Sequence, residues 1–137
     1  MFYGAAYAAD PAAKANDDAE KIQGSWKIES AQNNGRTSPA DANKLVTIVI
    51  SADKLSLKVG GQTVGEMTYK LDAAHGWIDL VDIRERVKRV GHGIYELKGD
   101  DLKVCYPETS NERSTAFESK SDNSPNDVLL MLKREKT

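Results

Sequence analysis

The fold is decided by residues 44–71, which read KLVTIVISADKLSLKVGGQTVGEMTYKL. The first run, Lys44–Ser51, is rich in β-branched residues and almost continuously apolar, as expected of a strand buried over much of its length. The next run, Lys54–Val59, alternates between apolar and polar residues, which is the period of a half-buried strand. A glycine pair at residues 60–61 then favours a tight turn, and the chain returns through Thr63–Leu71. This stretch predicts antiparallel strands joined by short hairpins.

The same pattern continues on both sides of this stretch. Short runs with a period of two recur between turn residues, and no segment after Lys21 has a convincing helical period. Antiparallel pairing follows, because parallel strands need long crossovers that this pattern lacks. A series of short strands must also protect its edges, so we predict an all-β, up-and-down barrel of eight or nine strands. The candidate strands are Ser25–Gln32, Lys44–Ser51, Lys54–Val59, Thr63–Leu71, Trp77–Ile83, Gly93–Leu97, Leu102–Tyr106, Thr115–Lys120 and Asp127–Lys133.

Length and composition limit the possible classes of protein. The chain has 137 residues, about one domain, with 39% hydrophobic residues, 29% charged residues and a formal net charge of −2. This balance excludes collagen-like, strongly disordered and membrane-spanning classes, and it gives no general attraction to nucleic acid. A single cysteine, Cys105, excludes an intramolecular disulfide framework, and two histidines leave little material for a histidine-rich metal site. No linker divides the chain, so we expect one barrel domain over residues 22–137.

Residues 1–21 differ from the rest, and we expect a flexible leader or the remnant of a signal peptide. Ala6-Tyr7-Ala8 has the small-x-small shape of a signal-peptidase site. There is no charged n-region, however, and the apolar stretch is short for a complete signal peptide. Two interpretations stay open. One is a truncated signal peptide, which places the protein in the periplasm or outside the cell, and the other is a disordered alanine-rich arm.

The residues that open the first strand, Gly24-Ser25-Trp26, resemble the Gly-x-Trp signature of lipocalins. More of the chain, from Ile22 to Arg134, is similar to a family of uncharacterised lipocalin-like domains found mainly in planctomycete bacteria. The resemblance implies a lipocalin-like barrel and often an exported setting, with no established activity and no agreed catalytic residues. The basic stretch at residues 84–89 departs from the family's pattern. The matching segments are residues 22–27, 53–55, 67–72, 78–80, 93–100, 102–106 and 128–134.

Two residues are candidates for closing the barrel. We expect Trp26 to be a core closure residue rather than a ligand-stacking platform, because a large aromatic side chain in a small barrel contributes mainly burial. The resemblance implies that Arg134 lies across Trp26, in a cation–π contact worth roughly 0.5–2 kcal/mol. An exposed terminal arginine is the alternative for Arg134.

The exposure of two further side chains, Asp79 and Cys105, depends on which face of their strand turns inward. If Ile78 and Leu80 face inward, Asp79 is solvated, and this option is favoured because it buries no carboxylate. In the other register Asp79 is a candidate polar contact in a pocket. Cys105 shares a face with Lys103, which favours an exposed or half-buried structural cysteine. No motif links this cysteine to a histidine base, so a nucleophilic role is disfavoured.

The sequence carries no positive sign of catalysis. It contains no glycine-rich phosphate loop, no nucleophile elbow and no paired-cysteine zinc motif, so we expect no enzyme, no metal and no cofactor. The basic stretch at residues 84–89 has a local net charge of +3, which suits either a solvated hairpin tip or a site for a polyanion.

Three functions stay open, and an enzyme is the least favoured of them. The first is an exported binding protein for a small apolar molecule, which predicts a barrel cavity of about 300 Å³ or more. The second is an interaction or inhibitor domain that contacts a protein partner through the rim loops 33–43, 84–92 and 107–114, and a filled interior favours it. Neither function involves nucleic acid or a membrane span. The tentative ligand contacts are Trp26, Leu57, Met67, Tyr69, Asp79 and Tyr95.

Overall fold

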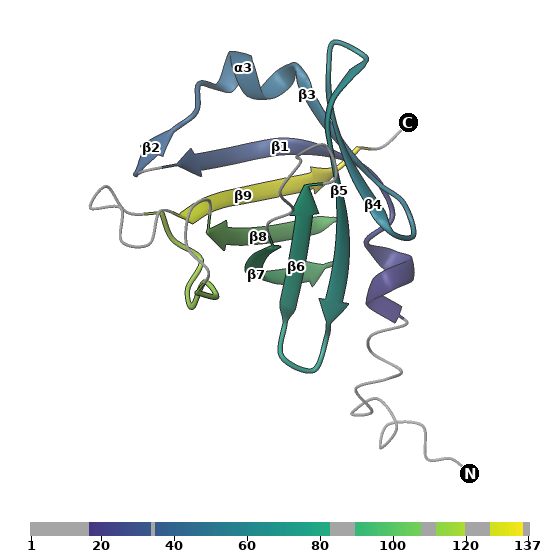
Figure 1. Ribbon diagram of the computed structural model, residues 1–137. Helices are drawn as coiled ribbons and strands as arrows, with labels where there is room; N and C mark the ends of the chain where they lie inside the picture. Colours follow the sequence, from purple (N-terminus) through teal and green to yellow (C-terminus); the bar gives the residue numbers. More distant parts are fainter. Residues whose placement is uncertain (1–16, 34, 83–89, 108–111, 120–126, 136–137) are drawn as a thin grey trace.

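The computed structural model describes residues 17–33, 35–82, 90–107, 112–119 and 127–135, and it shows an antiparallel β-barrel (Figure 1). A short helix at residues 17–21 precedes the first strand. The elements that follow are β1 (Gly24–Asn33), β2 (Arg36–Thr37), α3 (Ala40–Lys44), β3 (Val46–Ile50), β4 (Lys54–Val59), β5 (Gln62–Asp72), β6 (Trp77–Asp82), β7 (Val90–Lys98), β8 (Asp101–Pro107) and β9 (Asp127–Arg134).

Pairing between β1 and β9 closes the barrel. From β3 to β9 each strand pairs antiparallel with the next in sequence, and β1 pairs with β3 on one side and β9 on the other. Trp26 of β1 lies opposite both Ile48 and Arg134. Eight strands therefore form the closed wall, and the two-residue strand β2 pairs only with the last residues of β1. The predicted antiparallel all-β barrel is confirmed.

Alternation along the strands sorts side chains between the interior and the solvent. In β6, Ile78 and Leu80 are only 1% and 5% exposed, and Asp79 between them lies on the outer face. The β4–β5 hairpin turns at Gly60 and Gly61, whose φ angles of 59° and 86° are left-handed. Glycine adopts this conformation at no steric cost, so the glycine pair allows the tight turn. The register then shifts between Leu57 and Lys58, two residues before the turn.

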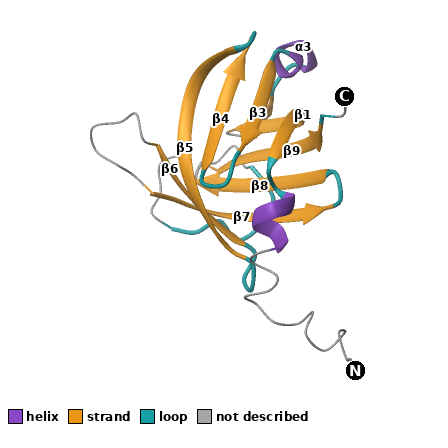
Figure 2. Cartoon of the chain, turned by 90° about the vertical axis from the view of Figure 1, so that its right-hand side faces the viewer, coloured by secondary structure: helices purple, strands orange, loops and turns teal. Residues whose placement is uncertain are grey.

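The segment that leads into β1 closes one end of the barrel (Figure 2). Ile22 and Trp26 are completely buried, and the indole Nε1 of Trp26 donates a hydrogen bond of 2.9 Å to the Ile22 carbonyl. This closed end continues into the barrel core. The other buried members of the core are Ile48, Ile50, Tyr69, Ile78, Leu80, Tyr95, Leu102, Val104 and Leu132.

Two expectations about secondary structure are wrong. Residues 115–119 are not a strand, because β8 already pairs with β7 on one side and β9 on the other, which leaves no free edge beside it. Ala40–Lys44 forms the helix α3, which at five residues is too short to produce a helical period in the sequence. Within the described ranges, no helix is long and apolar enough to cross a membrane.

Candidate functional site

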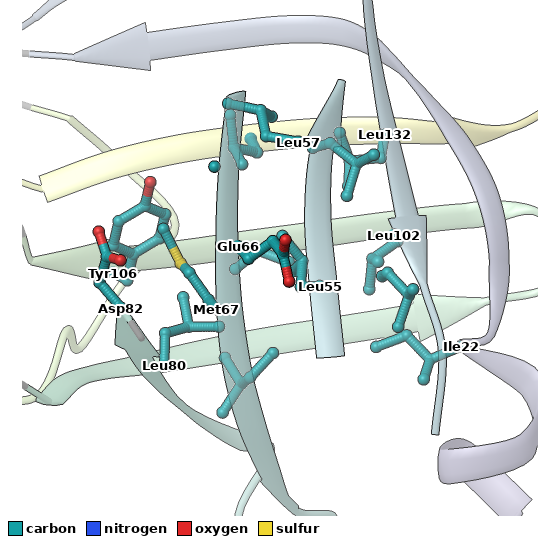
Figure 3. Close-up of a pocket in the computed structure, with 16 residues that line it drawn as sticks. Ile22, Leu55, Leu57, Glu66, Met67, Leu80, Asp82, Leu102, Tyr106 and Leu132 are labelled. Atoms are coloured by element: carbon teal, nitrogen blue, oxygen red, sulfur yellow. The ribbon is translucent and has the colours of Figure 1, made fainter. Parts of the chain in front are cut away.

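The barrel encloses a cavity of about 90 Å³, which is well below the expected volume of about 300 Å³. Its wall is almost entirely apolar and comes from inward positions of β3, β4, β5, β6, β8 and β9, with Ile22 at the closed end. Figure 3 shows the side chains that define it, among them Leu55, Leu57, Met67, Leu80, Leu102 and Leu132. The apolar wall suits a ligand that is itself apolar.

Three residues with polar groups also border the cavity: Glu66, Asp82 and Tyr106 (Figure 3). Asp82 is the last residue of β6, and it shares the inward parity of Ile78 and Leu80. In the view of Figure 3, Asp82 and Tyr106 lie on the opposite side of the cavity from Ile22. The cavity thus combines an apolar interior with polar groups in its border.

Two of the six predicted ligand contacts, Leu57 and Met67, border the cavity. Tyr69 and Tyr95 are buried in the core but do not line the cavity, and their hydroxyl groups bind other segments of the chain. The Tyr69 hydroxyl donates a hydrogen bond of 2.6 Å to the Ser51 carbonyl. Burial raises the pKa of this hydroxyl, and the nearby carboxylate of Asp53 raises it further, so Tyr69 stays a neutral donor.

Tyr95 ties the helix at residues 17–21 to the barrel. Its hydroxyl donates a hydrogen bond of 2.5 Å to the carboxylate of Asp18. Burial raises the pKa of the hydroxyl strongly, and the negative charge of Asp18 raises it further. This contact closes the barrel end, and it involves two residues 77 positions apart, which explains why sequence reasoning did not find it.

Trp26 and Arg134 lie together at the closed end. The Arg134 guanidinium carbon is 4.3 Å from the centroid of the Trp26 ring. The same guanidinium donates to the backbone carbonyls of Gln23, at 2.8 Å, and Lys21, and its Nε donates to Asp100 at 3.2 Å. Arg134 is therefore a partly buried brace that fixes the segment before β1 against the end of β9.

Asp79 belongs to a polar cluster on the outer face of β6 and β7. Its Oδ1 accepts a hydrogen bond of 2.8 Å from Nη2 of Arg113 and lies 3.0 Å from Nδ1 of His92. Nη1 of Arg113 donates to the Gly93 carbonyl at 2.8 Å. Burial alone would raise the pKa of Asp79, but the hydrogen bonds from His92 and Arg113 and the positive charge of Arg113 outweigh it and lower the pKa. Sequence reasoning missed Arg113, because it reaches this cluster from a segment without regular structure.

Trp77 packs beside the same cluster. The Arg113 guanidinium carbon is 4.3 Å from its ring centroid, and the His75 ring stacks on it at 4.2 Å. His75 is itself paired with Asp72 at 2.9 Å. A surface groove runs past Trp77. The rings of His75 and Trp77 and the guanidinium of Arg113, which line this groove, already pack against one another. This arrangement is a structural stack that holds the 112–119 segment.

Residues 112–119, which we term the strap, cover Cys105 on the outside of the barrel. Cys105 is 0% exposed, so the expected exposure is wrong, because a segment without regular structure covers the outer face of its strand. Its thiol donates to the Glu118 carbonyl at 3.6 Å and lies 3.9 Å from Oδ2 of Asp127. Burial raises the pKa of both Cys105 and Asp127. A thiol with a raised pKa has little thiolate, which argues against a catalytic nucleophile.

The underside of the strap leaves two polar atoms unpaired. Ser114 is 2% exposed and Asp127 is 8% exposed, and neither Oγ of Ser114 nor Oδ1 of Asp127 has a hydrogen-bond partner in the described part of the chain. The Ser114 hydroxyl is near enough to moderate the rise in the Asp127 pKa, although the two groups lack the geometry of a hydrogen bond.

The remaining predictions concern metals and the basic stretch. Across residues 17–33, 35–82, 90–107, 112–119 and 127–135, no group of three or more histidine, cysteine, aspartate or glutamate residues is arranged to hold a metal ion. The basic stretch at residues 84–89 and residues 1–16 of the leader lie outside the described residues.

Comparison of the chain with protein-family models, with curated proteins and with solved structures finds no match. The assignment of the fold therefore rests on the strand order, the β1–β9 pairing and the packing of the interior.

Proposed function

We propose that this protein is a lipocalin-like binding protein that holds a small apolar molecule inside its barrel. The observation that carries the proposal is the apolar cavity inside the barrel, whose wall is formed mainly by leucine, isoleucine and valine side chains from five strands and by Met67 of a sixth. A filled barrel would need no such space, since protein interiors are close-packed and voids cost stability.

The volume of the cavity restricts the size of the ligand. An apolar cavity of about 150 Å³ binds benzene, whereas drug-sized ligands need about 300 Å³ or more. At about 90 Å³, the barrel suits a thin aliphatic chain of a few carbons or the tip of a longer one. Met67 in the wall offers some adaptability, because its unbranched side chain can change rotamer to admit a longer chain.

An exported setting belongs to the same proposal. It is supported by the Ala6-Tyr7-Ala8 pattern and by the resemblance of the chain to a family of lipocalin-like domains that are often exported. A barrel that carries apolar molecules through an aqueous compartment would use a cavity of this kind. No catalytic step is part of the proposal.

An interaction domain is the alternative function, and one observation favours it. Leu45, Val59 and Val64 are 61%, 38% and 47% exposed, and they lie in or beside α3 and the β4–β5 hairpin. Exposed aliphatic side chains grouped on one part of a surface are typical of a surface that contacts another protein. This alternative predicts that the interior accepts no ligand.

A titration with 1-pentanol tests the proposed function. We expect the methyl resonances of Leu57 and Met67 to shift and saturate, with a roughly millimolar affinity for so small a molecule. Leu57→Phe should weaken binding at least tenfold, because the larger ring occupies the cavity. The control is Leu45→Phe, which makes the same change at an exposed residue and should leave binding unchanged. A linear response without saturation, or equal binding by both variants, would contradict the proposal.

A further inference from the structure

We propose that Cys105 is a modification site gated by the strap. With the strap closed the thiol is inaccessible, and with the strap released it forms a mixed disulfide with a small disulfide molecule. The site lies on the outside of the barrel, so this inference is independent of ligand binding in the interior.

The strap is held by the hydrogen bond from the Gly35 N–H to Oγ of Ser119, at 3.1 Å, by the Phe117 ring near Lys103, and by a group of contacts made by Arg113. Its guanidinium donates to the Gly93 carbonyl and to Asp79, each at 2.8 Å, and packs against Trp77. The next residue, Ser114, donates its backbone N–H to the His92 carbonyl at 3.1 Å. Loss of the one arginine would remove both side-chain hydrogen bonds and the ring contact together.

The underside of the strap is polar and incompletely satisfied. Cys105 faces the Glu118 carbonyl at 3.6 Å, while the unpaired Oγ of Ser114 and Oδ1 of Asp127 are buried in the same cluster. A buried polar atom without a partner costs free energy that hydration recovers. Opening the strap hydrates these atoms and exposes the thiol, so the segment is a favourable place for local opening without global unfolding.

The chemistry of the open state is thiol–disulfide exchange. The Cys105 thiol loses its proton to water or to the Asp127 carboxylate, and the thiolate Sγ attacks one sulfur of the small disulfide. A new S–S bond joins Cys105 to one half of the reagent, the original S–S bond breaks, and the other half leaves as a thiolate. Cys105 is oxidised to the mixed disulfide, and the departing half is reduced. The closed state disfavours this reaction, because burial raises the pKa of the thiol.

The test is the rate at which the full chain reacts with the aromatic disulfide 5,5′-dithiobis(2-nitrobenzoate). We expect slow reaction of the wild type and at least tenfold faster reaction of Arg113→Ala. Arg113→Lys should lie between them, because lysine keeps the charge but cannot make the paired hydrogen bonds of a guanidinium. Lys98→Ala, which removes an exposed cation from β7, the strand whose His92 and Gly93 carbonyls contact the strap, is the matched control and should react at the wild-type rate.

Urea unfolding of the same variants separates local opening from global unfolding. We expect the free energy of opening, obtained from the labelling rates, to be clearly smaller than the global free energy of unfolding. The proposal is overturned if Arg113→Ala and the wild type react equally fast, or if the two free energies agree in both proteins. Reaction of the wild type as fast as a free thiol in solution would also overturn it, since the strap would then provide no protection.

Discussion

At the scale of single residues, Arg134 stabilises the closed end of the barrel. It packs on Trp26 and donates to two backbone carbonyls and to Asp100. Arg134→Ala should lower the free energy of unfolding by about 2–4 kcal/mol, since a cation–π contact and several charge-assisted hydrogen bonds are lost together. Urea titrations followed by far-UV circular dichroism measure this loss. The control is Lys133→Ala, at an exposed neighbouring residue, and an equal effect of the two changes would contradict the role of Arg134.

The lowered pKa of Asp79 predicts that the stability of the protein depends on pH. Burial raises the pKa of Asp79, but His92 and Arg113 have the larger effect and lower it overall. The Asp79 carboxylate is therefore harder to protonate in the folded protein than in the unfolded chain. The stabilisation is therefore complete above the ordinary aspartate value of about 4 and is lost as the pH falls through the lowered folded value. Asp79→Asn should be less stable than the wild type at pH 7, and the difference should shrink towards pH 3.

Urea midpoints at the two pH values measure this dependence. Asp41→Asn serves as the control, because Asp41 is an exposed residue in the first turn of α3. A constant difference between Asp79→Asn and the wild type from pH 7 to pH 3 would show that the Asp79 cluster does not stabilise the fold through its charge.

Alternation along a strand predicts whether a side chain is exposed only where no other segment covers that face of the strand. It places Ile78 and Leu80 inside and Asp79 outside, as the structure has them. The same reasoning fails for Cys105, whose side chain lies on the outer face of β8 and is nevertheless buried by the strap. Arg113 could not be assigned from sequence either, because its partners Asp79 and Gly93 are 34 and 20 residues away.

At the scale of elements, the pairing of β7 with β8 depends on a glycine. A Cβ at Gly93 would lie 2.6 Å from the Cys105 carbonyl oxygen and 2.9 Å from Cβ of Tyr106, so the two strands would have to separate. Gly93→Ala should therefore destabilise the protein by about 1–3 kcal/mol or more, as overpacking does elsewhere. Gly65→Ala in β5 is the matched control, because its Cβ would meet only Leu57 at 3.7 Å, an ordinary contact.

Thermal unfolding followed by circular dichroism compares the two glycine variants. A melting temperature lower for Gly93→Ala than for Gly65→Ala is the expected result. If both variants melt with the wild type, then β7 and β8 do not approach each other as closely as the structure indicates.

Elements with a strong local pattern could be predicted, and elements set by distant contacts could not. The β4–β5 hairpin was predictable, because its alternation and its glycine pair both act locally. Residues 115–119 have a composition compatible with a strand but lack an available edge, since β8 and β9 pair directly. The availability of an edge is a property of the whole sheet and is absent from the local sequence.

At the scale of the whole molecule, the barrel and its interior follow from different properties of the sequence. The period of the strands determines that apolar side chains face a common axis, which was enough to predict the barrel. The volume left inside depends on how individual side chains pack, and the sequence does not specify it. The cavity of about 90 Å³ is accordingly smaller than the predicted volume, and it changes the expected ligand to a thin aliphatic chain.

The most direct test of the central claim is the methyl NMR spectrum of the protein under xenon pressure. Xenon enters apolar cavities of this size without needing a specific contact. We predict saturable shifts of the methyl groups of Leu55, Leu57 and Leu132, which border the cavity, and no such shifts for Leu45 on the surface. Unchanged interior methyl resonances, or equal responses inside and outside, would contradict an open apolar space within the barrel.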